Sequence, residues 1–205
     1  MKLLLHTCCG PCLLYPLDSL RQQGIEPVGY FFNPNIHPLL EFERRVEALE
    51  TVCQKRGVEM VWDSRLYGLD DWLRELGGRF SQQERCPVCY RIRLEAAARA
   101  ASALGFSAFS TTLLYSKYQR HELIRRMGEE IARAHGLDFF YQDFRTGWSQ
   151  GIEEAKAIGI YRQPYCGCIF SEAERYKGRK GRMEKRLLAG AGGISGAETA
   201  DIAVN

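Results

Sequence analysis

Seven of the eight cysteines in this sequence of 205 residues fall into three short groups. Thiolates are soft metal ligands, and they are also the reactive form in thiol redox chemistry. A set of thiols this dense therefore predicts either a soft-metal site or a redox site. The three groups are Cys8, Cys9 and Cys12; Cys86 and Cys89; and Cys166 and Cys168.

The first group occupies a turn of a kind that commonly binds ligands. The apolar run Leu3 to Leu5 precedes it and an amphipathic segment, Leu13 to Gln23, follows it, which predicts a strand, a tight turn and a helix. In open α/β sheets such a turn lies at the carboxyl end of a strand and the positive end of a helix, where thiol pKa values fall. Nucleotide-binding proteins have glycines or a phosphate loop here. His6, which ends the strand, is expected to be buried and hydrogen-bonded.

Two other interpretations of the thiols remain open. The segment from Cys9 to Cys12 is identical to the thioredoxin motif Cys-Gly-Pro-Cys, so a thioredoxin-like dithiol oxidoreductase is one alternative. Such a domain needs only one pair of cysteines. Pairs of the Cys86–Cys89 type also form structural zinc sites, which makes a zinc-stabilised RNA-binding protein the other alternative. Adjacent cysteines such as Cys8 and Cys9 suit a four-iron cluster better than a zinc ribbon, because a cluster spreads its ligands over several irons.

The third group has a single residue between its thiols. A disulfide between Cys166 and Cys168 would close a small, strained ring, and strained disulfides are easily reduced. The spacing favours a redox-active pair, and two separate metal ligands are the alternative. The eighth cysteine, Cys53, shares a helical face with Phe42 and Leu49 and is expected to pack in the core.

Strand-like and helix-like patterns alternate along the chain. This alternation predicts an α/β fold with a three-layer, doubly wound, mostly parallel sheet of the Rossmann-like type, with the cysteine-rich site at the rim formed by the strand carboxyl ends. We expect residues 1–188 to form a single catalytic domain and the glycine- and alanine-rich residues 189–205 to be a disordered tail. The predicted strands are 3–5, 28–33, 58–62, 106–111 and 137–141, and the predicted helices are 13–23, 39–56, 69–76, 86–104, 119–135 and 149–158.

The formal charge of +3 is too small to imply a nucleic-acid partner by itself, but its distribution is uneven. Residues 175–186 carry seven basic side chains and one acid. No apolar stretch is long enough to span a membrane, and the apolar run at the start is too short for a signal peptide. We therefore expect a cytoplasmic protein without a membrane partner. In that compartment the eight cysteines are not expected to form structural disulfides.

Further polar side chains follow predicted strands and so belong to the same rim as the thiols. The loop after the second strand contains Asn33, Asn35 and His37, and Tyr115 and Ser116 follow the fourth strand. The carboxyl ends of parallel strands meet at one edge of a sheet, and ligands bind there. We therefore interpret these five side chains as candidate substrate contacts.

At these residues the sequence resembles the cobalamin-independent epoxyqueuosine reductases, the QueH family. Five motifs carry the resemblance, in the family's order, across residues 2–175. One of them alone would be a weak signal, but five together are highly specific. They are Leu5-His6-Thr7-Cys8-Cys9-Gly10-Pro11-Cys12, Phe32-Asn33-Pro34-Asn35-Ile36-His37-Pro38, Arg85-Cys86-Pro87-Val88-Cys89-Tyr90, Ser110-Thr111-Thr112-Leu113-Leu114-Tyr115-Ser116 and Tyr161-Arg162-Gln163-Pro164-Tyr165-Cys166-Gly167-Cys168-Ile169-Phe170-Ser171.

The resemblance implies the last step of queuosine synthesis on tRNA. The epoxide of epoxyqueuosine, at the wobble position, is reduced to the alkene of queuosine with loss of water, which takes two electrons and two protons. It further implies a [4Fe-4S] cluster with an adjacent metal ion, an electron donor, and a redox-active CxC pair, here Cys166 and Cys168. A cluster transfers one electron at a time, so a second redox partner helps to complete the pair of electrons.

The expected cluster and the expected tRNA contacts can be assigned to particular residues of this sequence. Cys12 is expected to lie beside the cluster, either as a ligand of an additional iron or other divalent ion or as a reactive thiol. The fold also resembles that of ATP-using tRNA-modifying enzymes, but thiols replace their pyrophosphate-binding loop, so no use of ATP is expected. The expected cluster ligands are Cys8, Cys9, Cys86 and Cys89, and the expected tRNA-phosphate ligands are Lys177, Arg179, Lys180 and Arg182.

Overall fold

The computed structural model describes residues 2–65 and 67–190, which form one α/β domain and a projecting terminal helix. Helices and strands alternate as the sequence predicts. The strands are β1 (Leu3–His6), β2 (Val28–Phe31), β3 (Met60–Trp62), β4 (Ala108–Thr111) and β5 (Asp138–Phe139). The helices are α1 (Gly10–Arg21), α2 (Leu39–Arg56), α3 (Leu69–Leu76), α4 (Gln82–Ala103), α5 (His121–Ala134), α6 (Trp148–Ile158) and α7 (Ile169–Gly190), with the 3₁₀ turns η1 (Thr112–Tyr115) and η2 (Phe144–Gly147).

The five strands form one parallel sheet in the order β3-β2-β1-β4-β5. The chain moves from β1 outward to β2 and β3, then crosses back and adds β4 and β5 on the other side of β1. In sheets of this kind ligands bind outside the strand carboxyl ends where the order reverses. Here that point lies between β1 and β4, directly after His6 and Thr111.

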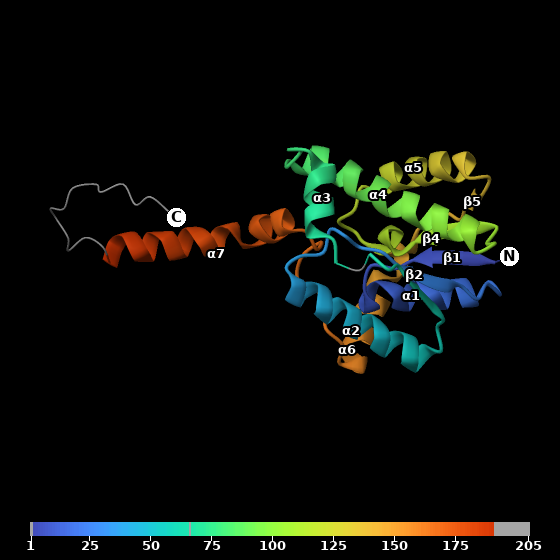
Figure 1. The fold of residues 1–205 in the computed structure, drawn as a ribbon. Coiled ribbons are helices and arrows are strands. Elements are labelled where there is room, and N and C mark those ends of the chain that lie inside the picture. Colours follow the sequence, from blue (N-terminus) through green and yellow to red (C-terminus); the bar gives the residue numbers. More distant parts are fainter. Residues whose placement is uncertain (1, 66, 191–205) are drawn as a thin grey trace.

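Helices cover both faces of the sheet, as a doubly wound fold requires. Figure 1 shows α1, α2 and α6 on one face and α3, α4 and α5 on the other. Because both faces are covered, β1 is buried along its whole length, and its sequence is a nearly continuous apolar run. The helix contact that positions the first cysteine group is especially close. A Cβ on Gly10 would lie 2.3 Å from the carbonyl oxygen of Ala48, so α1 can approach α2 only with glycine there.

The start of α4 differs from the sequence prediction. Pro87 favours the first turn of a helix, so the helix was expected to open at Cys86, whereas α4 begins at Gln82 and contains Pro87 in its second turn. A proline there leaves the carbonyl of the residue four positions earlier without its helical donor. That carbonyl belongs to Gln83, and it accepts a hydrogen bond from Arg120 Nη1 at 3.3 Å. Cys86 and Cys89 therefore lie inside a helix.

The basic segment 175–186 is helical, although glycine is a weak helix former and the segment contains two glycines. Residues 169–190 form one continuous helix, α7, through Gly178 and Gly181, and it extends away from the domain (Figure 1). Its first turn is anchored by Phe170, which packs on Trp72 and Phe80. The predicted boundary at 188 falls near the end of this helix, and residues 191–205 of the predicted tail lie outside the described residues. None of the helices in residues 2–65 and 67–190 is long and apolar enough to cross a membrane.

Candidate active site at the sheet edge

A cavity of about 450 Å³ is lined by residues that follow the carboxyl ends of β1 and β4. Cys8 and Cys12, from the turn after β1 and the start of α1, line it together with Cys166 from the far end of the chain. Tyr115 and Ser116, which follow β4, form part of the opposite wall. The cavity therefore brings two of the three thiol groups to one place. A larger cavity of about 650 Å³ between α3 and α4 has no thiol among its lining residues.

The first cysteine group is compact and buried. The sulfurs of Cys8, Cys9 and Cys12 all lie within 4.8 Å of one another. Hydrogen bonds from the Cys12 and Cys9 thiols hold the pKa of Cys8 well below its usual range, against the effect of burial. The pKa of Cys12 is raised well above its usual range because its proton bonds the Cys8 sulfur. Thr112 Oγ1 from η1 also donates to the Cys8 sulfur at 3.5 Å.

Gln163 closes the first group from the side of the terminal segment. Its Nε2 donates to the sulfur of Cys9 at 3.0 Å and to that of Cys12 at 3.4 Å. Its Oε1 is buried and has no hydrogen-bond partner among the described residues. Gln163 also lines the cavity.

The other two cysteine groups lie near each other. The pKa of Cys86 is raised to about 11 and that of Cys89 to about 12, mainly by burial and to a smaller extent by the charges of Cys166 and Cys168. Cys86 and Cys89 do not belong to the compact group of three. Cys166 is exposed, whereas Cys168 is buried beside Trp72 and accepts a hydrogen bond from the backbone of Ser171 at 3.3 Å.

Arg93, on α4, lies between the two sets of thiols. Its guanidinium is buried, lines the cavity, and donates to the sulfur of Cys89 at 3.8 Å. Its charge also lowers the pKa of Cys8, after the larger effect of the neighbouring thiols. His6 and Asn33 hold it in place, with contacts at 3.4 Å and 2.7 Å. The prediction that His6 is buried and hydrogen-bonded is confirmed.

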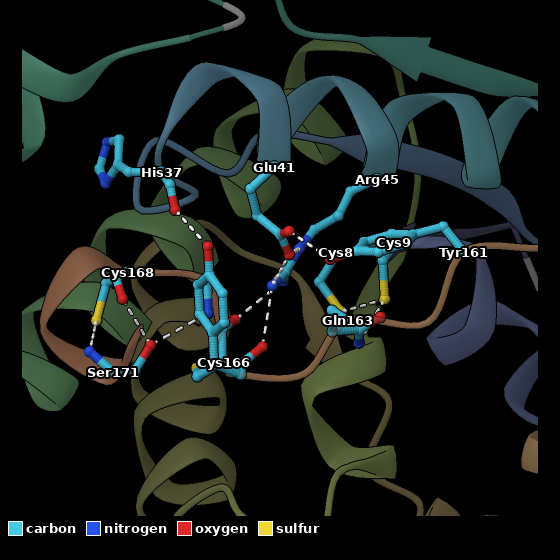
Figure 2. Close-up of polar contacts among 12 residues, drawn as sticks. Cys8, Cys9, His37, Glu41, Arg45, Tyr161, Gln163, Cys166, Cys168 and Ser171 are labelled. Atoms are coloured by element: carbon cyan, nitrogen blue, oxygen red, sulfur yellow. Dashed lines mark hydrogen bonds and ion pairs between the residues drawn. The ribbon is translucent and has the colours of Figure 1, made fainter. Parts of the chain in front are cut away.

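Helix α2 holds the terminal cysteine segment through a buried ion pair (Figure 2). Arg45 pairs with Glu41 at 2.7 Å and donates to the carbonyls of Tyr165 at 2.9 Å and Cys166 at 3.0 Å. Tyr161 donates to the second oxygen of Glu41. The same segment thus reaches the thiols of Cys9 and Cys12 through Gln163, and it also reaches the α2 ion pair. Figure 2 shows Gln163 at Cys9 and Arg45 at Glu41.

The turn between Cys166 and Cys168 depends on glycine. Gly167 has a φ of 137°, a backbone conformation that side chains strongly disfavour. A Cβ there would also lie 3.2 Å from Arg45 Nη1 and 3.3 Å from Asn35 Nδ2. The close fit of this turn against α2 therefore requires glycine between the two cysteines.

The predicted substrate contacts divide into two sets. Tyr115 and Ser116 line the cavity. Asn33 does not line it, and its side-chain amide is occupied by Thr7 and Arg93. His37 is buried against Trp72, and burial lowers its pKa to about 4, so its ring is neutral near pH 7. Asn35 is buried as well, with an unpartnered Oδ1 among the described residues.

Several functional candidates were not predicted from the sequence. Arg45 and Arg93 occupy helices in which charged residues usually face solvent, and only the fold places them at the thiols. Tyr118 is 81% exposed, lies at the cavity and packs edge-on against Trp148. A cluster of aromatic and basic residues after a strand is the only sequence signal that could have found this wall. Arg162 and Arg175 add positive charge to the lining.

The donor set fits a soft metal centre. The buried sulfurs of Cys8, Cys9 and Cys12 could hold a metal ion by their spacing. The nearby guanidinium of Arg93 has sulfur on one side and no carboxylate within ion-pair distance among the described residues. A buried cation of this kind matches an anionic metal–thiolate centre better than neutral thiols.

Comparison with protein families and known proteins agrees with the motifs. Residues 3–174 match the family described as epoxyqueuosine reductase QueH. The chain is 34% identical over 175 residues to epoxyqueuosine reductase QueH of Dehalococcoides mccartyi, covering 85% of this chain and 94% of that protein. It is 35% identical over 181 residues to the protein of the same name from Thermotoga maritima, covering 84% and 91%.

The fold is similar to that of a solved structure from another family. This structure is described as a predicted subunit of a tRNA methyltransferase from Methanocaldococcus jannaschii. It has a TM-score of 0.50, 10% sequence identity and coverage of 76% of each chain. The likeness supports the predicted doubly wound α/β fold.

We expect Arg45→Met to destabilise the domain and loosen the cysteine segment. The change leaves the Glu41 carboxylate buried without its partner, which costs about 3–5 kcal/mol in comparable buried pairs. Urea unfolding followed by circular dichroism measures this destabilisation. The double variant Glu41→Gln, Arg45→Met should recover part of it, because no unpaired charge then remains.

The matched control is Arg74→Met, which removes the exposed pair with Asp71, 2.7 Å apart. Exposed pairs contribute about 1 kcal/mol or less, so this variant should unfold at nearly the wild-type urea concentration. Equal destabilisation by Arg45→Met and Arg74→Met would contradict a specific role of the buried pair.

Proposed function

The chain belongs to the epoxyqueuosine reductase QueH family, and from this membership we propose that it reduces epoxyqueuosine in tRNA to queuosine. Two electrons and two protons convert the epoxide of the substrate's cyclopentane ring into an alkene, and the epoxide oxygen leaves as water. The observation that carries the proposal is the cavity lined by thiols at the sheet edge, within the residues, 3–174, that match the family. Free thiols and a tRNA substrate both favour the cytoplasm as the compartment.

The cavity suits a polar ring system with a reactive side arm. Its volume of about 450 Å³ falls within the range of small-molecule sites. Tyr115 and Trp148 stack with ring centroids 5.1 Å apart, and Tyr118 stands at the edge of Trp148. Aromatic faces of this kind stack on bases taken out of an RNA helix. We propose that the modified base enters along this wall, with its epoxide directed at the thiols.

We propose that Cys8, Cys9, Cys86 and Cys89 bind a [4Fe-4S] cluster. Such a cluster would supply electrons one at a time and could polarise the epoxide oxygen. The compact group contains Cys8 and Cys9, and Arg93 connects it electrostatically to Cys89. Cys12 lies within 4.8 Å of Cys8 and Cys9, lines the cavity, and is assigned to an additional metal ion or to direct reaction.

The redox pair and the tRNA contacts complete the proposal. Cys166 lines the cavity and Cys168 is buried. Oxidation of both thiols to a disulfide would release the two electrons and two protons that reduction of the epoxide consumes, and an external electron donor would restore the dithiol after turnover. Helix α7 begins beside the cavity, which Arg175 lines, and extends outward with exposed basic side chains. A helix placed in this way can follow the phosphates of a tRNA whose modified base occupies the cavity.

The central experiment combines iron and sulfide analysis with a reductase assay on anaerobically prepared protein. Wild-type protein should contain a four-iron cluster and convert epoxyqueuosine in tRNA to queuosine, read as the loss of one oxygen atom by nucleoside mass spectrometry. Replacing Cys89 by Ser should remove most of both the iron and the activity. The control is Cys53→Ser, because Cys53 packs against the core away from the thiol groups and should change neither.

Cys12→Ser separates the roles within the first group. If Cys12 lies beside the cluster, the variant keeps its visible absorbance and loses most of its turnover. Loss of iron in Cys12→Ser, with retention in Cys8→Ser or Cys9→Ser, would reassign Cys12 as a cluster ligand. A colourless, iron-free and fully active wild-type preparation would refute the cluster altogether.

Cys166 and Cys168 should cycle between dithiol and disulfide. Alkylation of protein that has turned over without added reductant, followed by peptide mass spectrometry, should find both thiols protected, and prior reduction should expose both. Cys53 provides the internal control, because its alkylation should not depend on reductant. Full alkylation of the pair after turnover, or normal activity of Cys166→Ser, Cys168→Ser, would contradict a redox role.

Neutralising the basic face of α7 should weaken tRNA binding. Fewer bound phosphates mean fewer released counterions, so affinity should fall by about tenfold or more and the salt slope by roughly one for each phosphate that is no longer bound. A salt titration of tRNA affinity measures both. The variant replaces four exposed residues by Gln: Lys177, Arg179, Lys180 and Arg182.

A matched variant neutralises four exposed arginines on α4 and α5 and should bind tRNA nearly as wild type does. Unchanged affinity and slope in the α7 variant would place the tRNA footprint elsewhere. The four control arginines, each replaced by Gln, are Arg91, Arg99, Arg125 and Arg133.

A further inference from the structure

Arg93 differs from the other buried arginines in what balances its charge. Arg45 pairs with Glu41 at 2.7 Å, and Arg85 pairs with Glu174 at 2.6 Å. Arg93 is 2% exposed, yet no carboxylate of residues 2–65 and 67–190 lies within ion-pair distance of it. A buried cation without an anion costs several kcal/mol, so an anion is expected nearby.

The polar groups that hold Arg93 are neutral. Asn33 Oδ1 accepts from Nη2 at 2.7 Å, and His6 Nε2 lies 3.4 Å from Nε and 3.2 Å from the carbonyl oxygen of Phe32. An imidazole carries no negative charge in either protonation state, so His6 cannot balance the guanidinium. Asn33 is fixed in turn by its bond to the Thr7 carbonyl, at 2.9 Å. These bonds orient the guanidinium, but they do not balance its charge.

The remaining neighbours of the guanidinium are sulfurs. Nη1 donates to Cys89 at 3.8 Å, and Arg93 lines the same cavity as Cys8 and Cys166. Cys8 follows β1, Cys89 lies on α4 and Cys166 precedes α7, so three parts of the chain bring sulfurs either into contact with Arg93 or to the cavity that it lines. The anion that Arg93 requires is therefore thiolate, free or bound to metal.

We propose that Arg93 is a positioning residue that balances the charge of the thiolate centre and raises its reduction potential. This inference rests on the proposed cluster, which four thiolates would make negative overall. Reduction adds one electron and makes the centre more negative, while Arg93 stays positive in both states. A fixed cation beside the centre stabilises the reduced state more than the oxidised state, because the attraction grows with the negative charge.

The test is a potentiometric titration of the loaded protein, followed by its spectrum, in three variants. Arg93→Met removes the charge and should shift the midpoint potential to a more negative value. Arg93→Lys keeps a cation there and should stay close to wild type. Arg91→Met is the control, because Arg91 lies on the same helix, is exposed and pairs with Glu130 at the surface, 3.4 Å away.

A further variant serves if Arg93→Met does not fold. Asn33→Asp places a carboxylate at the 2.7 Å contact and neutralises Arg93 without removing its side chain. Its potential should also become more negative than that of wild type. Circular dichroism and iron content establish that each variant is folded and loaded.

The outcomes distinguish this inference from the proposed function. An unchanged potential in loaded Arg93→Met or Asn33→Asp overturns it, even if wild type reduces epoxyqueuosine normally. An equal negative shift in Arg93→Lys and Arg93→Met overturns it too, because the charge would then not be the cause. If wild-type protein binds no cluster, the proposed cluster is overturned, and the proposed role of Arg93 is overturned with it.

Discussion

Burial of charge at the sheet edge is the constraint on which the rest of the structure depends. Cysteine sulfurs, two guanidiniums and a carboxylate lie out of water at this site, where an unpaired charge would be costly. The fold satisfies them by pairing. Arg93 faces the sulfurs from α4, and Arg45 faces Glu41 and the carbonyls of the terminal segment from α2. The two helices on opposite faces of the sheet thus contribute one arginine each to the same site.

The topology explains how sequence-distant thiols meet. β1 is central, so the turn that follows it lies at the position where the strand order reverses. β4 pairs with β1 and delivers Thr112 to Cys8, while the segment after α6 crosses this edge and delivers Gln163 to Cys9 and Cys12. That crossing segment has few regular hydrogen bonds of its own and depends on Arg45 for its path. The proposed redox pair, Cys166 and Cys168, lies at the end of this segment and outside the sheet.

The sequence predicted the parts of the fold that local patterns determine. The alternation of strands and helices was confirmed, and the bounds of α2 and α3 agree with the prediction because Gly57 and Gly77 end them in the left-handed conformation. The predicted start of α4 was wrong because Pro87 lies inside the helix. The Gln83 carbonyl, which Pro87 leaves without a helical donor, is bonded by Arg120, 37 residues farther along the chain. Arg45 and Arg93 were missed for the same reason. Their partners are distant in the chain, and a charged residue in a helical pattern normally faces solvent. The assignment of each thiol as a ligand or a redox partner stays a prediction.

Anomalous scattering at the iron edge, from crystals of anaerobically loaded protein, tests the central claim most directly. The claim is that sulfurs from the turn after β1 and from α4 converge on one centre beside Arg93. The proposed ligand set predicts a compact four-iron peak bonded to Cys8, Cys9, Cys86 and Cys89, next to the cavity that Cys12 lines. A peak bonded only to Cys8, Cys9 and Cys12, with Cys86 and Cys89 uncoordinated, would contradict it.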